Sequence, residues 1–167
     1  MKSFKTHIAE NKGLRFVFDN LKIISTPGKN LLINSKFMTN IFDLKVELEY
    51  HEYMLKFLSD KLSSADVNNL NLRLHQLNDI SITIKNLNSN AVLDDIQLFE
   101  IKKFAIISQS IKEILLAKDF NIFELHDLDK VVSILDPDNT GETAFYIYSS
   151  YDSQLSKLRK KYQDLNS

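Results

Sequence analysis

The chain has 167 residues, enough for a single domain with a hydrophobic core, and its 44% hydrophobic and 26% charged residues are ordinary for a globular protein. It contains no cysteine, which excludes disulfides, thiolate catalysis and cysteine-ligated metals, and this fits a reducing, cytoplasmic setting. The formal net charge of −1 gives no electrostatic case for nucleic-acid binding by this chain alone, and no apolar run is long enough to span a membrane.

The chain contains few residues that break helices, which indicates that its helices are long. Only three glycines and two prolines occur, and leucine, isoleucine, lysine, glutamate and asparagine are abundant. We therefore predict a mainly all-α fold, a multi-helix bundle with one short strand or hairpin near residues 142–150. Residues 1–12 are polar, lack the apolar core of a signal peptide and are predicted to form a flexible arm, with a helical domain at 13–167.

The first predicted helix covers residues 14–24, where apolar residues recur at helical spacing. A turn formed by Thr26, Pro27 and Gly28 follows, with Thr26 as the helix N-cap and Pro27 at the first helical position, and it leads into a short helix to about residue 37. This Gly-Lys turn is not a phosphate-binding loop, because residue 23 is not glycine and residue 30 is neither serine nor threonine.

A long helix is predicted from the Thr-Asn cap at 39–40 to about residue 61. Its apolar residues alternate three and four apart and form a heptad seam that includes His51, which we expect to be packed in the core: Ile41, Leu44, Leu48, His51, Leu55, Leu58 and Leu62. A second row containing Tyr53 and Phe57 widens the predicted buried face and favours a bundle over a two-stranded coiled coil. A capping box from Ser63 to Asp66 then begins an antiparallel partner helix that runs to about residue 87.

The central helix is predicted at 94–118, capped by Asp94 with Gln97 at the reciprocal position. Its middle is apolar nearly all round, so we expect it to be covered on several sides. A brief helix near 125–135 and the β-favouring segment 142–150 follow. Asp152 caps a last helix at 153–165, which reaches the end of the sequence as if the domain continued, so we expect a fragment of a longer protein.

The segment 136–141, Asp-Pro-Asp-Asn-Thr-Gly, matches the first half of an EF-hand loop. The second half fails, because Ile147 occupies the twelfth position, where a bidentate glutamate is required. The four histidines share no metal-ligand spacing, and no nucleophile, base and oxyanion donor can be assembled. We therefore predict a turn, no catalytic residue, and no metal or cofactor in this chain.

The last helix carries a modest basic stripe of four residues, Lys157, Arg159, Lys160 and Lys161. Four cations without a wider basic surface give little phosphate affinity, so these residues form a weak candidate for nucleic-acid contact and a solvated face otherwise. On the same helix, Leu155 and Leu158 are predicted to dock it onto the bundle.

The succession of segments resembles the beginning of the core (lever) domain of the MutS family of DNA mismatch-repair proteins. The matching pieces are the helix ending in a Thr-x-Gly-Lys turn at 21–31, Phe37 with the long helix from Asn40, the LFEIKKF segment at 98–104, and the segment LDPDNTGETAFYIYSSYDSQLSKLRKK at 135–161. In the family, a comparable Leu-Asp-x-x-Gly segment, a short strand and an x-x-Leu-x-x-Leu-Arg helix lead into the long lever. The resemblance runs from about Leu14 to the end of the sequence.

The resemblance implies a structural domain that transmits conformational change between a DNA clamp and an ATPase, possessing no catalysis of its own. The mismatch-reading Phe-x-Glu, the connector and the Walker motifs are absent, as in MutS2-like or other shortened branches, so ATP and Mg would be bound by the parent protein. Its partners would be the parent's clamp and ATPase domains, DNA through the parent, and a second copy in a homodimer. A free-standing helical interaction module unrelated to DNA is the alternative.

Overall fold

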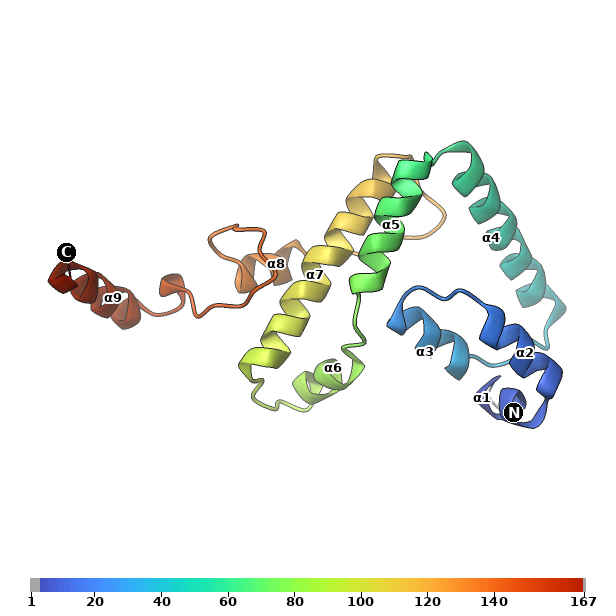
Figure 1. Cartoon of the computed structure of the whole chain (residues 1–167), viewed down its shortest axis with the longest axis horizontal. Coiled ribbons are helices and arrows are strands. Elements are labelled where there is room, and N and C mark those ends of the chain that lie inside the picture. The colour runs from blue at the N-terminus through green and yellow to red at the C-terminus, as the bar shows by residue number, and fades with distance from the viewer. Residues whose placement is uncertain (1–3, 167) are drawn as a thin grey trace. The chain divides into compact units, whose positions relative to one another are not determined.

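The computed structural model describes residues 4–166, and within them nine α-helices and one 3-10 turn form, with no β-strand (Figure 1). The expected mainly all-α fold is therefore confirmed. The elements are α1 (Phe4–Glu10), α2 (Lys12–Asn20), α3 (Thr26–Asn34), α4 (Ile41–Asp60), α5 (Ser64–Gln76), α6 (Ser81–Asn88), α7 (Asp95–Leu116), α8 (Asp129–Leu135), the 3-10 turn η1 (Ser149–Tyr151) and α9 (Ser153–Asn166).

The strand predicted at 142–150 is wrong. Residues 142–148 are irregular, and η1 begins at Ser149. The aromatic and β-branched residues fit a strand locally, but a strand needs a neighbour to pair its backbone, and the described residues provide none. Side-chain contacts hold this segment instead, as described below.

The chain divides into two compact units. One contains residues up to 79 together with 110–126, and the other contains residues 80–109 together with those from 127 onward. Helix α7 contributes its first part to the second unit and its last part to the first. None of the helices in residues 4–166 combines the length and the apolarity that crossing a membrane requires.

The predicted flexible arm is helical over most of its length. Phe4 and His7, both on α1, place their rings against Phe37 at centroid distances of 5.6 and 4.9 Å, and Phe4 also contacts Phe18. These aromatic contacts explain why a polar stretch is ordered: two of its few apolar or aromatic side chains have partners. Residues 1–3 of the predicted arm lie outside the described residues.

The turn before α3 is shifted by one residue from the prediction. Ser25, not Thr26, is the N-cap, and its hydroxyl accepts a hydrogen bond from the Gly28 amide at 3.1 Å. Thr26 and Pro27 occupy the first two helical positions, which suits Pro27 because its missing N–H has no partner there. A Cβ at Gly28 would lie 2.8 Å from the Ser25 hydroxyl, so glycine lets the cap close.

The capping box before α5 is confirmed. The Ser63 hydroxyl accepts from the Asp66 amide at 3.2 Å, and Asp66 accepts from the Ser63 amide at 2.9 Å. Asp66 also pairs with Lys118 at 2.8 Å. Hydrogen bonds from Lys118 and from Ser63 lower the pKa of Asp66 to about 2. The cap thus joins the start of α5 to the end of α7 within the first unit.

A small aromatic and aliphatic core holds the first unit together. It consists of four buried residues from α4, the turn after it, α5 and the loop after α7: Phe57, Leu62, Leu70 and Phe120. The rings of Phe57 and Phe120 meet edge to face at 5.1 Å. The ring of Tyr53 is stacked on that of Phe57, with 6.1 Å between the ring centroids, and completes the cluster.

The α4 seam, however, is not buried. We use "α4 seam" for the six heptad positions on this helix: Ile41, Leu44, Leu48, His51, Leu55 and Leu58. All six are exposed, and the His51 ring contacts Glu47 of its own helix, at 2.7 Å from the carbonyl and 3.8 Å from the carboxylate, so its predicted core position is wrong. The predicted antiparallel hairpin is also wrong, because α5 diverges from α4 after the turn (Figure 1) and so cannot cover its seam.

The helix predicted to reach residue 87 is broken in two. It ends at Gln76, and a second helix begins at Ser81. The apolar spacing continues through the break, and no glycine or proline marks it, which is why the pattern did not reveal it.

Candidate functional site

The second unit is built around a lysine with no solvent exposure. Lys102 lies in the middle of α7, on the face that also buries Ala105, and its side chain is 0% exposed. The cap predicted at the start of this helix is confirmed: Asp94 accepts from the Gln97 amide at 2.8 Å, and Gln97 accepts from the Asp94 amide at 3.1 Å. The cap fixes the helix start two turns before Lys102.

Three acceptors converge on the Lys102 ammonium. Nζ donates to Asp136 Oδ1 at 3.1 Å, to the Ala144 carbonyl at 2.9 Å and to Tyr148 Oη at 2.9 Å. An ammonium has three N–H donors, so its hydrogen-bonding capacity is filled. We call Lys102, Asp136 and Tyr148 the lysine joint, because they tie the irregular segment 136–148 to α7.

The Asp136 carboxylate is equally well satisfied. Besides Lys102, it accepts from Tyr148 Oη at 2.8 Å, from Thr140 Oγ1 at 2.7 Å and from the Gly141 amide at 2.9 Å. Gly141 has a φ of +68°, in the left-handed region that glycine adopts at no steric cost. The EF-hand-like segment is therefore a turn, as predicted, and it folds around Asp136, whose carboxylate oxygens accept from protein donors.

The electrostatics of the joint favour the ionised pair. Burial on its own would raise the pKa of Asp136, but hydrogen bonds from Thr140, Gly141, Tyr148 and Lys102 outweigh it and hold that pKa well below its usual range. Burial likewise opposes the charge on Lys102, and its bonds to Tyr148 and Asp136 overcome this and raise its pKa. Both groups are charged at neutral pH.

This arrangement suits a structural part better than a catalytic one. A lysine that acts as a base or forms a Schiff base has to lose its proton and reach a substrate. Lys102 is held protonated, is 0% exposed and has all three donors engaged. What the geometry can do is fix a loop rigidly to a helix.

The joint continues into α9. Asp152 accepts from the Gln154 and Leu155 amides at 2.7 and 2.8 Å, which confirms the predicted cap. Arg159 donates to the Ile147 carbonyl at 2.8 Å and to Ser149 Oγ at 3.1 Å, so it is used within the fold. Lys157, Lys160 and Lys161 of the predicted basic stripe are exposed.

The predicted docking face on α9 is only half formed. Leu155 is half-buried, but Leu158 is 65% exposed and packs no core in the described structure. The Asp152 cap holds the start of the helix, and Arg159, further along it, bonds the segment before it. A row of leucines does not dock this helix.

We expect Leu158→Ala to change the free energy of unfolding by about 0.5 kcal/mol or less, as is usual for surface substitutions. Leu155→Ala should cost more, about 1–2 kcal/mol, because part of its side chain leaves water on folding. Urea denaturation followed by circular dichroism measures both. A loss of several kcal/mol in Leu158→Ala alone would contradict the exposed position of this side chain.

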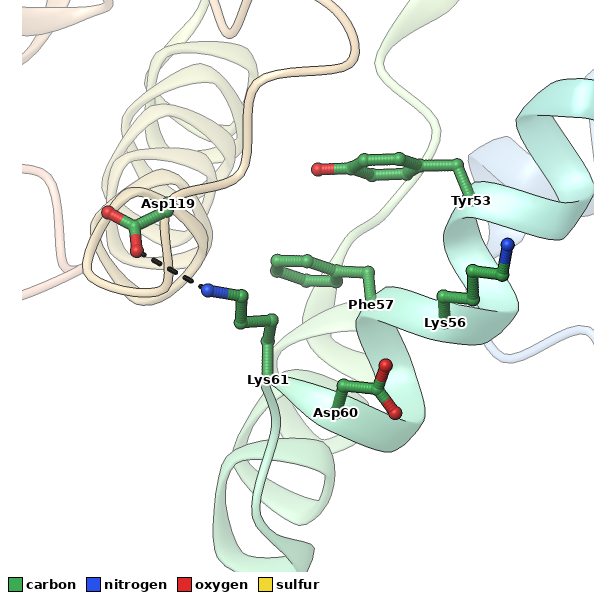
Figure 2. Close-up of a pocket in the computed structure, with 6 residues that line it drawn as sticks. All are labelled: Tyr53, Lys56, Phe57, Asp60, Lys61 and Asp119. Atoms are coloured by element: carbon green, nitrogen blue, oxygen red, sulfur yellow. Dashed lines mark ion pairs between the residues drawn. The ribbon is translucent and has the colours of Figure 1, made fainter.

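The pocket drawn in Figure 2 lies in the first unit and has a volume of about 220 Å³. The rings of Tyr53 and Phe57 project from α4 along one wall, and Lys61 forms an ion pair with Asp119 at 3.6 Å. Its described cations and carboxylates number two each, Lys56 and Lys61 with Asp60 and Asp119, so it offers no strong electrostatic preference for a ligand.

Among residues 4–166, no three histidine or carboxylate side chains gather in a way that could hold a metal ion. Comparison of the chain with models of protein families, with curated proteins and with solved structures finds no match. The interpretation of the site therefore depends on its own geometry.

Sequence reasoning missed Lys102 and Tyr148. The available signal was a lysine aligned with apolar residues one turn before and after it, Leu98 and Ala105. This pattern places the lysine on a buried face, where a charge needs a partner. The partner could not be identified from the sequence, because Asp136 lies 34 residues away.

Asp136 is expected to contribute to the pH dependence of stability, beside Asp66 of the first unit. The folded pKa of Asp136 lies below the usual 3.8, so its contribution is present above about pH 4 and is lost as pH falls through the lower folded value. The folded pKa of Lys102 lies above 10.5, so its contribution is full below that value and is lost as pH rises through the folded one. The joint should therefore contribute constantly between about pH 5 and 9.

Urea denaturation at a series of pH values, comparing wild type with Asp136→Asn, checks this expectation. The stability difference between the two should grow from about pH 2 to pH 5 and then remain constant. Asp138→Asn is the matched control, since it removes an exposed carboxylate of the same turn. A difference between wild type and Asp136→Asn that does not change with pH would contradict the expectation.

Proposed function

We propose that this chain is the N-terminal part of the core (lever) domain of a MutS-family DNA mismatch-repair or recombination ATPase. Its role is structural: it links the DNA clamp of the parent protein to the ATPase and transmits conformational change between them. The lysine joint is the observation that supports this proposal most strongly.

Two of the segments that carry the resemblance, 98–104 and 135–161, contain the residues that build the joint and its continuation. Asp136 and Gly141 belong to the segment compared with the family's Leu-Asp-x-x-Gly, although four residues separate them here, and Arg159 is the arginine of the x-x-Leu-x-x-Leu-Arg helix. Asp136 binds Lys102 of the LFEIKKF segment, and Arg159 binds the backbone at residue 147. Residues that are distant in the sequence thus serve one mechanical purpose.

A lever transmits motion only if its parts keep their geometry under load, and a buried, fully hydrogen-bonded ion pair provides that stiffness. Breaking such a pair leaves an uncompensated buried charge, so the segment 136–148 has a strong energetic preference for one position on α7. Through the joint, a change in the orientation of α7 would be transmitted to α9.

In this proposal the chain itself is not an enzyme. ATP and Mg would bind the ATPase domain of the parent protein, where they would drive the conformational change. The phosphate contacts would be made mainly by other domains, with Lys157, Lys160 and Lys161 adding a small, salt-sensitive share. The parent would act in the cytoplasm, where the absence of cysteine is ordinary.

Reading the native gene beyond codon 167 tests the proposal. We expect the frame to continue through helical segments to a strand followed by G-x-x-x-x-G-K-[ST], the phosphate loop of the ATPase. A stop codon directly after codon 167 would overturn the proposal, since no ATPase would be present to drive the lever.

The second candidate function is a free-standing helical module for protein–protein interaction. The exposed apolar faces of α4 and α9 favour it, because monomeric domains rarely leave two such faces in water. A stop codon after codon 167, together with a partner protein recovered on the immobilised chain and lost when Leu158 and Leu165 are changed to serine, would favour this function.

A further inference from the structure

Helix α4 presents to solvent a stripe of five aliphatic side chains and one histidine, the α4 seam. Leu48 is 60% exposed and Leu55 is 68% exposed, and the other members of the α4 seam are exposed as well. The stripe follows the alternating three- and four-residue spacing of a coiled coil over the 20 residues of the helix, about 30 Å.

The seam is separate from the face that α4 uses within its own chain. Tyr53 and Phe57 point to the core of the first unit and contact Phe120. On a helical projection at about 100° per residue, their row is centred nearly half a turn away from the seam. The helix can therefore keep its internal contacts while the seam binds another helix.

The spacing of the seam is self-complementary in the antiparallel direction. If two copies of α4 run antiparallel with Leu48 opposite His51, Leu44 lies opposite Leu55 and Ile41 lies opposite Leu58. All six seam positions find a partner in this register, and each histidine packs against a leucine. A parallel pair would place the two copies of His51 against each other in the middle of the seam.

The charged residues beside the α4 seam also favour the antiparallel direction. In the antiparallel register, Lys45 lies about 3 Å along the helix axis from Glu52 of the other copy, and symmetry creates this attractive pair twice. In a parallel pair, Glu47 would lie beside Glu52 of the other copy, which is repulsive. Charge and spacing thus select the same direction.

We propose that the α4 seam is a self-association surface, on which a second copy of this chain docks its own α4 in the antiparallel direction. This surface belongs to the first unit and is independent of the lysine joint and of the lever role proposed above. It makes use of apolar side chains that the fold of a single chain leaves in water.

Cysteine cross-linking on the full chain tests both the association and its direction, because the sequence contains no other cysteine. A mixture of Leu44→Cys and Leu55→Cys chains is expected to form a disulfide-linked heterodimer on mild oxidation, and each variant alone should not. In the antiparallel register, residue 44 is about 16 Å along the axis from its own counterpart, too far for a disulfide. Cross-linking of Leu44→Cys with itself, but not with Leu55→Cys, would overturn the antiparallel pairing.

Sedimentation velocity over a range of concentrations measures the association itself. Leu48→Ser with Leu55→Ser should weaken the dimer at least tenfold, and Ile82→Ser, which changes a 76% exposed side chain on α6, should leave it unchanged. A wild-type chain that stays monomeric at several hundred micromolar would overturn the proposal. Circular dichroism of the variants checks that each one is folded.

Charge reversal provides a second measure that does not alter the seam. Lys45→Glu or Glu52→Lys alone should weaken the dimer several-fold, and both changes together should restore it, because the attractive pair re-forms with its charges exchanged. A parallel dimer gives another result: Glu52→Lys alone strengthens it by removing the repulsion from Glu47. That result would overturn the proposed direction.

Discussion

Replacing Lys102 by methionine is expected to lower the free energy of unfolding by about 3–5 kcal/mol, the usual cost of removing one partner of a buried ion pair. The Asp136 carboxylate stays buried and loses its partner cation, and Tyr148 Oη and the Ala144 carbonyl lose the Lys102 donor. Methionine fills a similar volume, so the loss reflects charge and hydrogen bonding more than an empty space. Urea denaturation followed by circular dichroism measures it.

Two further variants isolate the cause. Lys130→Met removes an exposed lysine from α8 and should change stability by about 0.5 kcal/mol or less. Lys102→Met combined with Asp136→Asn should be less destabilising than the sum of the single changes, because the second change removes the stranded charge. Additive losses would mean that the two residues do not act on each other.

Replacing Phe120 by alanine should cost about 3–5 kcal/mol, as is usual for a buried phenylalanine. The side chain is 4% exposed and its ring contacts those of Tyr53, Phe57 and Phe123. It comes from the loop after α7, so its loss leaves a cavity and frees the contact between that loop and α4. Thermal and urea denaturation measure the effect, and a four-residue core offers little to compensate it.

Phe42→Ala is the matched control for this change, because Phe42 lies on α4 and is 72% exposed. It should leave the free energy of unfolding within about 0.5 kcal/mol of wild type. Similar losses for Phe42→Ala and Phe120→Ala would mean that the aromatic cluster does not hold the first unit together.

Local signals explain which parts of the fold were predictable. The caps at Ser63, Asp94 and Asp152 depend only on residues within one turn, and all three form as expected. The helix periods of α4 and α7 were equally clear, because many residues contribute to each. The cap at Ser25 was missed by one position, since serine and threonine are neighbours there and both suit the role.

The predictions failed where contacts between residues far apart in the sequence determine the structure. The α4 seam carries the pattern of a buried face, but burial also requires a partner, and spacing cannot show whether one is present. The segment 142–148 has strand-forming residues, yet Tyr148 is fixed by Asp136 and Lys102 instead of by a neighbouring strand. Lys102 resembled a solvated lysine because its partners lie 34 to 46 residues further along the chain.

The sharing of one ammonium among three acceptors has a consequence for how the second unit opens. The acceptors at positions 136, 144 and 148 span an irregular stretch with no regular backbone hydrogen bonding of its own. Withdrawal of Lys102 would break all three of these contacts with α7 together, so we expect the stretch to separate from α7 in one cooperative step. The attachment of this segment to α7 is thus expected to depend on one side chain, Lys102.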